Sequence, residues 1–116
     1  MPGPLAPPRP RAVRTRGRVE IRDRALLLGT RSVPLISGAV HYWRLERSAW
    51  RPALEELARL GFPIVETYVP WGVHETAAGE FDFGKKDARK DLGAFLDLAH
   101  EIGLVAFVRP GPHINA

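Results

Sequence analysis

Cysteine is absent from the 116 residues of this chain, and so are long apolar runs. Without cysteine there is no disulfide framework, no thiolate nucleophile and no thiolate zinc site. No stretch approaches the roughly 18 apolar residues of a membrane-spanning helix, and the N-terminal region lacks the apolar core of a secretory signal. We therefore expect no membrane partner and no signal peptide. The compartment stays open, with the cytoplasm slightly favoured.

Acidic residues are absent from the first 18 positions, which hold five prolines and five arginines. This composition cannot bury enough apolar surface to offset the entropy of ordering, so residues 1–18 are predicted to form a disordered Pro/Arg-rich leader. No aromatic residue is interleaved there to stack on bases, so we expect no nucleic-acid partner. A basic interaction module that acts through this arginine-rich tail stays an alternative.

After the leader, the hydrophobic pattern predicts a single α/β domain over residues 19–116. Apolar segments between residues 19 and 36 are typical of a short hairpin. The pattern then predicts parallel strands in the order β-α-β-α-β. The strands are expected at 36–42, 64–69 and 104–108, and amphipathic helices at about 50–60 and 88–102.

Alternation along these strands predicts which side chains share a face. We expect an apolar inner face made of Ile36, Val40, Ile64 and Val105 or Phe107. Glu66 and Arg109 are expected on the same face as an interior ion pair with a structural role, because a buried carboxylate must be paired or protonated. The third strand is nearly all apolar, which predicts burial on both of its faces.

Polar and aromatic side chains follow each predicted strand. They are His41, Tyr42, Trp43 and Arg44, then Tyr68, Trp71, His74 and Glu75, then Arg109, His113 and Asn115. Sugars are bound by aromatic faces together with a few polar groups, and this is such a set. His74-Glu75 lacks the second histidine of the zinc-binding His-Glu-x-x-His spacing, so we expect no metal site.

Three motifs in this order resemble the start of glycoside hydrolase family 35, the β-galactosidases. They are Ile36-Ser37-Gly38-Ala39-Val40-His41-Tyr42-Trp43-Arg44, then Ile64 to Glu75 with Tyr68-Val69-Pro70-Trp71, then Arg109-Pro110-Gly111-Pro112-His113-Ile114-Asn115-Ala116. The resemblance spans about residues 19–116 and implies an N-terminal fragment of a (β/α)8 TIM barrel, with three parallel strands and two helices after the hairpin. A complete barrel needs about 250 residues.

The resemblance also implies which residues bind a β-galactoside. Tyr68 would contact the galactose ring through its hydroxyl, and Asn115 and Ala116 would offer side-chain and backbone contacts to sugar hydroxyls. A wider group would line the site: His41, Tyr42, Arg44, Trp71, Glu75 and Arg109.

The implied reaction is retaining hydrolysis of terminal non-reducing β-D-galactosyl residues, without a cofactor. In the family its two glutamates follow strands four and seven, so we expect no catalytic residue in this chain and a truncated β-galactosidase that is inactive alone. A non-catalytic carbohydrate-binding remnant stays an alternative. The sequence does not indicate an oligomeric state.

Overall fold

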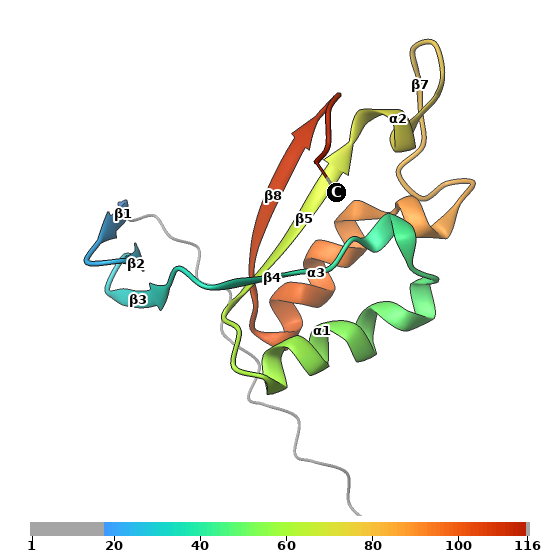
Figure 1. Cartoon of the computed structure of the whole chain (residues 1–116). Helices are drawn as coiled ribbons and strands as arrows, with labels where there is room; N and C mark the ends of the chain where they lie inside the picture. The colour runs from blue at the N-terminus through green and yellow to red at the C-terminus, as the bar shows by residue number, and fades with distance from the viewer. Residues whose placement is uncertain (1–17, 116) are drawn as a thin grey trace, which may run out of the picture.

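The computed structural model describes residues 18–115. The predicted leader, apart from Arg18, and the proposed sugar contact Ala116 lie outside the described residues. The described chain contains a small antiparallel sheet, a parallel sheet with helices on one side, and a loop region above the ends of the parallel strands (Figure 1).

The N-terminal segment forms three antiparallel strands where the pattern predicted a short hairpin. They are β1 (Val19–Arg22), β2 (Ala25–Leu28) and β3 (Arg31–Pro34), paired in chain order. Asp23 and Arg24 both have positive φ, 51° and 61°, which is the backbone of a two-residue type I′ hairpin turn. Gly29 opens the second turn with a φ of 63°. The second turn leads into a third strand, so this segment is a three-stranded sheet rather than a two-stranded hairpin.

The three predicted parallel strands are confirmed, with β5 at the centre of the sheet. They are β4 (Ser37–Ala39), β5 (Ile64–Pro70) and β8 (Val105–Gly111), in the order β4-β5-β8. In the register Ser37 lies beside Ile64, and Ile64 lies beside Val105. Strand β4 is shorter than predicted because the 3-10 helix η1 (Tyr42–Arg44) bends the chain soon after it. An α/β unit of this kind is compatible with part of a (β/α)8 barrel.

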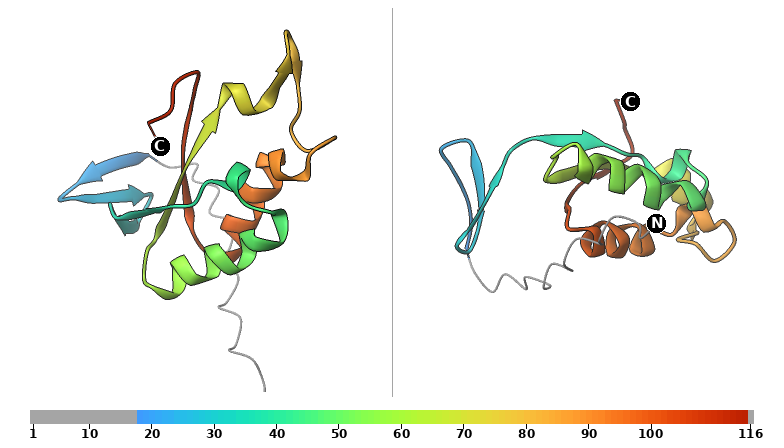
Figure 2. Two further views of the ribbon diagram at one scale, coloured as in Figure 1. Left: turned by 45° about the vertical axis from the view of Figure 1, so that its right-hand side comes forward. Right: turned by 90° about the horizontal axis from the view of Figure 1, so that it is seen from below.

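Both predicted helices are present and lie on the same side of the parallel sheet (Figures 1 and 2). Helix α1 (Trp50–Arg59) follows the short 3-10 helix η2 (Arg47–Ala49), and helix α3 (Leu92–Ile102) follows η3 (Ala88–Lys90). Helix α3 begins later than predicted because the Asp91 carboxylate accepts the Ala94 N–H and caps it there. It ends at Gly103, which is left-handed with a φ of 102°.

The core lies between the helices and the covered face of the sheet. Its fully or nearly fully buried members are Tyr42, Trp50, Leu54, Val65, Phe95, Ala99, Ile102 and Leu104. Trp50 and Phe95 meet edge to face at 5.4 Å, which is a favourable aromatic geometry. Gly38 allows α1 to approach β4, because a Cβ at this position would overlap the Leu57 side chain.

Two expectations about strand faces are wrong. On β5, Val65 faces the helices, so its neighbours Ile64 and Glu66 lie on the face that the helices leave open. Register partners in a parallel sheet point to the same side, so Ser37 and Ala39 lie on this open face as well. Val40 instead packs against the core, so the predicted phase of the first strand was off by one residue. The predicted burial of the third strand on both faces is also wrong: Phe107 is 57% and Val108 is 40% exposed, because β8 is an edge strand of the described sheet and neither face is fully covered there.

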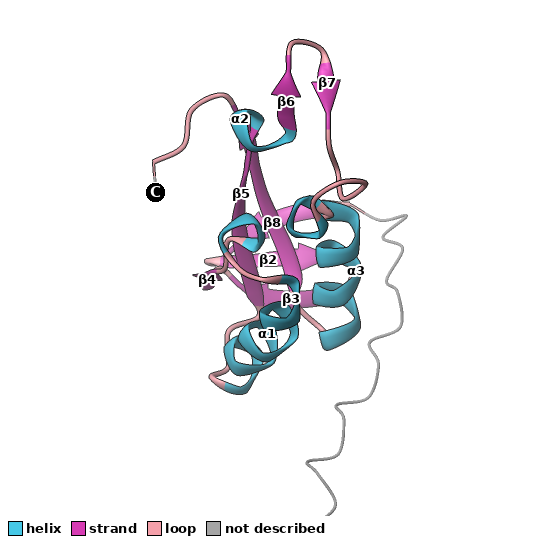
Figure 3. Cartoon of the chain, turned by 90° about the vertical axis from the view of Figure 1, so that its right-hand side faces the viewer, coloured by secondary structure: helices cyan, strands magenta, loops and turns pink. Residues whose placement is uncertain are grey.

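A loop region rises above the carboxyl ends of β5 and β8 (Figure 3). It consists of the single turn α2 (Trp71–His74) and a small hairpin of β6 (Glu75–Ala77) and β7 (Glu80–Phe81). The Asp82 carboxylate then accepts the backbone N–H groups of Gly84, Lys86 and Asp87, which fixes the turn that leads towards η3.

Candidate functional site

Tyr68 lies near the end of the central strand, held by its neighbours. The Trp43 indole donates to the Tyr68 carbonyl at 3.2 Å, and the Tyr68 N–H donates to His41 Nδ1 at 3.4 Å. The His41 ring lies 5.5 Å from the Tyr68 ring. Tyr68 is 8% exposed in total. Its hydroxyl has no hydrogen-bond partner among residues 18–115, where every fully enclosed polar side-chain atom has one, so the hydroxyl is not completely enclosed.

Arg109 covers the Tyr68 ring from the neighbouring strand. The two residues are register partners, and the guanidinium carbon lies 4.6 Å from the ring centroid. Arg109 Nη1 donates to Glu66 Oε1 at 2.9 Å, and Ser37 Oγ donates to the other carboxylate oxygen at 3.3 Å. The predicted Glu66–Arg109 pair is confirmed, but it lies on the open face and Arg109 is about half exposed. The hydrogen bond to Glu66 raises the pKa of Arg109.

His41 completes this group as a neutral imidazole. Burial lowers its pKa, the positive charge of Arg44 lowers it further, and Glu66 opposes both. Since His41 Nδ1 accepts the Tyr68 N–H, the remaining proton resides on Nε2. Arg44 itself is exposed and stacks over Trp43 at 4.5 Å. The predicted residues that meet on the open face are therefore His41, Tyr68 and Arg109.

Tyr42, also predicted to line the site, lies on the other side of the sheet. Its side chain has no exposed surface and packs between Trp50 and Phe95. Burial raises the pKa of its hydroxyl. This hydroxyl lies 2.6 Å from His74 Nε2, inside the core. Its contacts are those of a structural residue.

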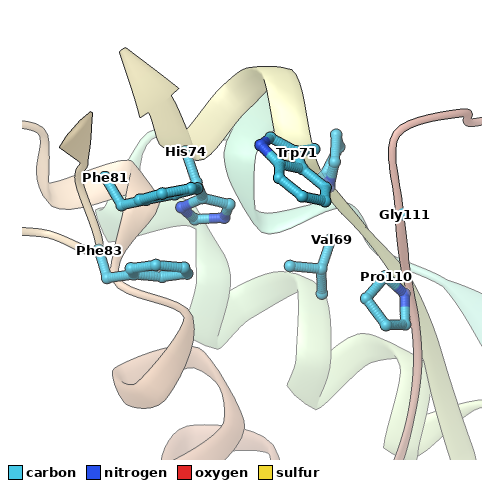
Figure 4. A pocket seen from close by; sticks show the side chains of 8 residues that line it. Val69, Trp71, His74, Phe81, Phe83, Pro110 and Gly111 are labelled. Carbon is cyan, nitrogen blue, oxygen red and sulfur yellow. The ribbon is translucent and has the colours of Figure 1, made fainter. Parts of the chain in front are cut away.

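Trp71 and Glu75 lie in the loop region rather than beside Tyr68. The Trp71 indole donates to Glu75 Oε2 at 3.1 Å, and Trp71 is 52% exposed. Trp71 borders an apolar hollow of about 220 Å³ (Figure 4). Its lining is Val69, Pro70, Trp71, His74, Phe81, Phe83, Pro110 and Gly111. Because Val69 packs against the core, this hollow opens on the helix side of the sheet.

Asn115 follows β8 and is exposed. The segment after β8 turns away from α3 and towards the β4 side of the sheet (Figures 2 and 3). No hydrogen bond joins Asn115 to Tyr68 among the described residues, and Ala116 lies outside them.

Two residues of the site were not chosen as site residues from the sequence. Trp43 was noted after the first strand, and its indole bond to the Tyr68 carbonyl now places it beside the site. Ser37 binds Glu66 from the neighbouring strand. Strand alternation with the correct phase would have found Ser37, because it lies two residues before Ala39 on the open face.

Neither a metal site nor a membrane-spanning helix is found in the described part of the chain. Within residues 18–115, no three His, Asp or Glu side chains gather in a way that could hold a metal ion. None of the helices in this same part of the chain is both long and apolar enough to cross a membrane.

Comparison with known proteins gives consistent matches. The beta-galactosidase of Felis catus is 42% identical over 81 residues, which cover 70% of this chain and 12% of that protein. Beta-galactosidase-1-like protein 3 of Homo sapiens is 38% identical over 110 residues, which cover 83% of this chain and 16% of that protein. This chain thus spans only a small part of the length of these relatives. A model of the glycosyl hydrolases family 35 matches residues 25–116, and the chain therefore belongs to this family.

Proposed function

We propose that this chain is the beginning of the catalytic barrel of a β-galactosidase. The complete enzyme would hydrolyse terminal non-reducing β-D-galactosyl residues with retention of configuration, without a cofactor. Support comes from the family match over residues 25–116 and from relatives named beta-galactosidase. The parallel sheet agrees with this role, since barrel enzymes bind substrate at the carboxyl ends of their strands.

The observation that carries the proposal is the state of Tyr68. Its ring lies beside Arg109 and His41, while its hydroxyl is not completely enclosed and has no partner among the described residues. A fixed ring with an available hydroxyl is suited to binding a sugar hydroxyl, because little side-chain freedom is lost when the ligand arrives. Asn115 and Ala116 would add contacts from the end of the next strand.

The chain would contribute sugar contacts to the complete enzyme, and other segments would supply the catalytic carboxyl groups. A retaining glycosidase needs two carboxyl groups about 5 to 5.5 Å apart, one as acid and base and one as nucleophile. By the family resemblance these groups follow strands four and seven, and the described parallel sheet has three strands. Neither nearby glutamate is suited to replace them. Glu66 is paired with Arg109, and Glu75 accepts a hydrogen bond from Trp71.

A chimera tests this proposal. Residues 25–116 would replace the matching segment of the Felis catus beta-galactosidase, and hydrolysis of a chromogenic β-galactoside would be measured beside the unfused 116-residue chain. We expect turnover by the chimera and none above background by the chain. A folded but inactive chimera would contradict the proposal. Turnover by the chain alone, abolished by Glu66→Gln or Glu75→Gln, would contradict the assignment of catalysis to other segments.

The alternative of a non-catalytic carbohydrate-binding protein rests on the same open face. It differs in one measurable respect, because the chain alone would then bind galactose as a stable unit. Calorimetric titration of the 116-residue chain with galactose distinguishes the two: saturable binding together with an inactive chimera would favour the alternative.

A further inference from the structure

We propose that Arg109 is a positioning residue that holds the Tyr68 ring in the orientation its hydroxyl needs to bind the sugar. This inference rests on the proposed function, because it assigns Arg109 a role through Tyr68. It differs from a purely structural role for the Glu66–Arg109 pair, in which loss of the pair would affect stability and leave the sugar contact unchanged.

The geometry joins three strands in one chain of contacts. Ser37 on β4 binds one oxygen of Glu66 at 3.3 Å, and Arg109 on β8 binds the other at 2.9 Å. Arg109 then covers the Tyr68 ring of β5 at 4.6 Å. Glu66 and Tyr68 lie two residues apart on one strand, so they share a face. The carboxylate therefore fixes the guanidinium at the place where it covers the ring.

The arrangement depends on arginine rather than on positive charge alone. A guanidinium is planar, so one group can donate to a carboxylate and also lie over an aromatic face. A lysine ammonium could pair with Glu66 but would not cover the ring in the same way. Arg109→Lys therefore separates positioning from charge, and Glu66→Gln weakens the anchor without removing Arg109.

The backbone of Tyr68 is also held in place by neighbouring side chains. Its N–H and carbonyl are bound by His41 and Trp43, and the His41 ring lies near its own. The two hydrogen bonds fix the Tyr68 backbone, and the His41 ring packs beside the Tyr68 ring. They leave Arg109 as the residue that covers the ring from β8. Replacing Arg109 would free the ring to rotate, and the hydroxyl would then lose its fixed direction.

The first test uses NMR on the full 116-residue chain. A guanidinium stacked on a ring has its neighbouring methylene protons shifted upfield by the ring current. We expect this shift for Arg109, its loss in Tyr68→Leu and its reduction in Glu66→Gln. The matched control is Arg51→Ala, which breaks a comparable exposed pair with Glu101 on the helix side and should leave the Arg109 signals unchanged. Ordinary Arg109 shifts in the parent chain would overturn the proposal.

The second test is a double-mutant cycle in the chimera described above. If Arg109 acts through the Tyr68 hydroxyl, Arg109→Lys should lower kcat/KM about tenfold in the parent chimera and less than about twofold in the Tyr68→Phe background. Arg51→Ala should change kcat/KM less than about twofold. Equal effects of Arg109→Lys in both backgrounds would overturn the positioning role. A folded, inactive parent chimera would overturn the proposed function and with it the sugar-positioning role, while the NMR test would still decide whether Arg109 stacks on Tyr68.

Discussion

The Tyr42 hydroxyl lies 2.6 Å from His74 Nε2, with both side chains almost completely buried. His74 Nδ1 lies 2.8 Å from the Asp82 carbonyl, which can only accept, so Nδ1 is the donor. In the neutral imidazole, Nε2 then accepts from Tyr42. His74 also stacks on Phe83 at 4.3 Å. One histidine thus connects the helix-side core to the loop region above the strand ends.

Tyr42→Phe should destabilise the fold. The substitution keeps the ring in the core but leaves His74 Nε2 buried without a donor, which costs about 1–3 kcal/mol in the free energy of unfolding. Urea unfolding of the 116-residue chain, followed by tryptophan fluorescence, measures this change. Tyr68→Phe is the matched control, because the hydroxyl it removes has no partner among the described residues, and its effect should stay within about 0.5 kcal/mol. Equal effects of the two substitutions would argue against the buried hydrogen bond.

Gly38→Ala should also be destabilising, for a steric reason. The added methyl group would overlap the Leu57 side chain and push α1 away from β4, and overpacking of this kind costs about 1–3 kcal/mol. Gly72→Ala serves as control, because nothing lies within 4 Å of a Cβ at that position. Adding Leu57→Ala to Gly38→Ala should recover part of the loss. Purely additive effects would mean that the two residues are not in contact.

The Asp82 turn should depend on pH. Burial of the Asp82 carboxylate would raise its pKa, but hydrogen bonds from the N–H groups of Lys86, Asp87 and Gly84 together outweigh burial and lower it. A carboxyl group whose folded pKa lies below its unfolded pKa stabilises the fold above the unfolded value, which is about 3.9, and loses this contribution as the pH falls through the folded pKa.

Asp82→Asn should therefore be less stable than the parent chain near neutral pH, and the difference should shrink as the pH falls below about 4. Urea unfolding at a series of pH values measures it. Asp97→Asn, which changes an exposed carboxylate on α3, is the control, and the stability it loses near neutral pH should be smaller. A gap between parent and Asp82→Asn that widens towards acid would reverse the predicted sign.

Much of the fold could be predicted because hydrophobic periodicity is strong where the chain forms its core. That periodicity predicts the apolar faces of helices α1 and α3, and it predicts the strands β5 and β8. The late start of α3 depends on the Asp91 side chain, which could act as a cap or remain solvated, and the pattern cannot decide between them.

The first strand shows why the rest could not be predicted. Its phase was set by the apolar residues Ile36 and Val40, but in the structure the helix side receives Gly38, Val40 and Tyr42. Gly38 carries no hydrophobic signal, although it lets Leu57 approach. Tyr42 was chosen because it follows the first strand and by the family resemblance, and neither signal indicates that its side chain lies in the core. His41 and Tyr68 could still be brought together, because residues at the carboxyl ends of adjacent parallel strands meet whatever the phase.

Tyr68→Phe in the chimera should lower kcat/KM. Loss of one neutral hydrogen bond to the sugar costs about 0.5–1.5 kcal/mol, and more if that bond strengthens in the transition state. Initial rates over a range of chromogenic β-galactoside concentrations measure the change. Unchanged kinetics would leave Tyr68 with a structural role.

A crystal structure of the active chimera with galactose would show whether the Tyr68 hydroxyl binds the sugar. We expect galactose at the carboxyl ends of β5 and β8, with a sugar hydroxyl about 2.5–3.0 Å from Tyr68 Oη. Arg109 should still cover the ring. Galactose bound in the barrel with Tyr68 Oη beyond hydrogen-bonding reach and no bridging water would show that this hydroxyl does not bind the sugar.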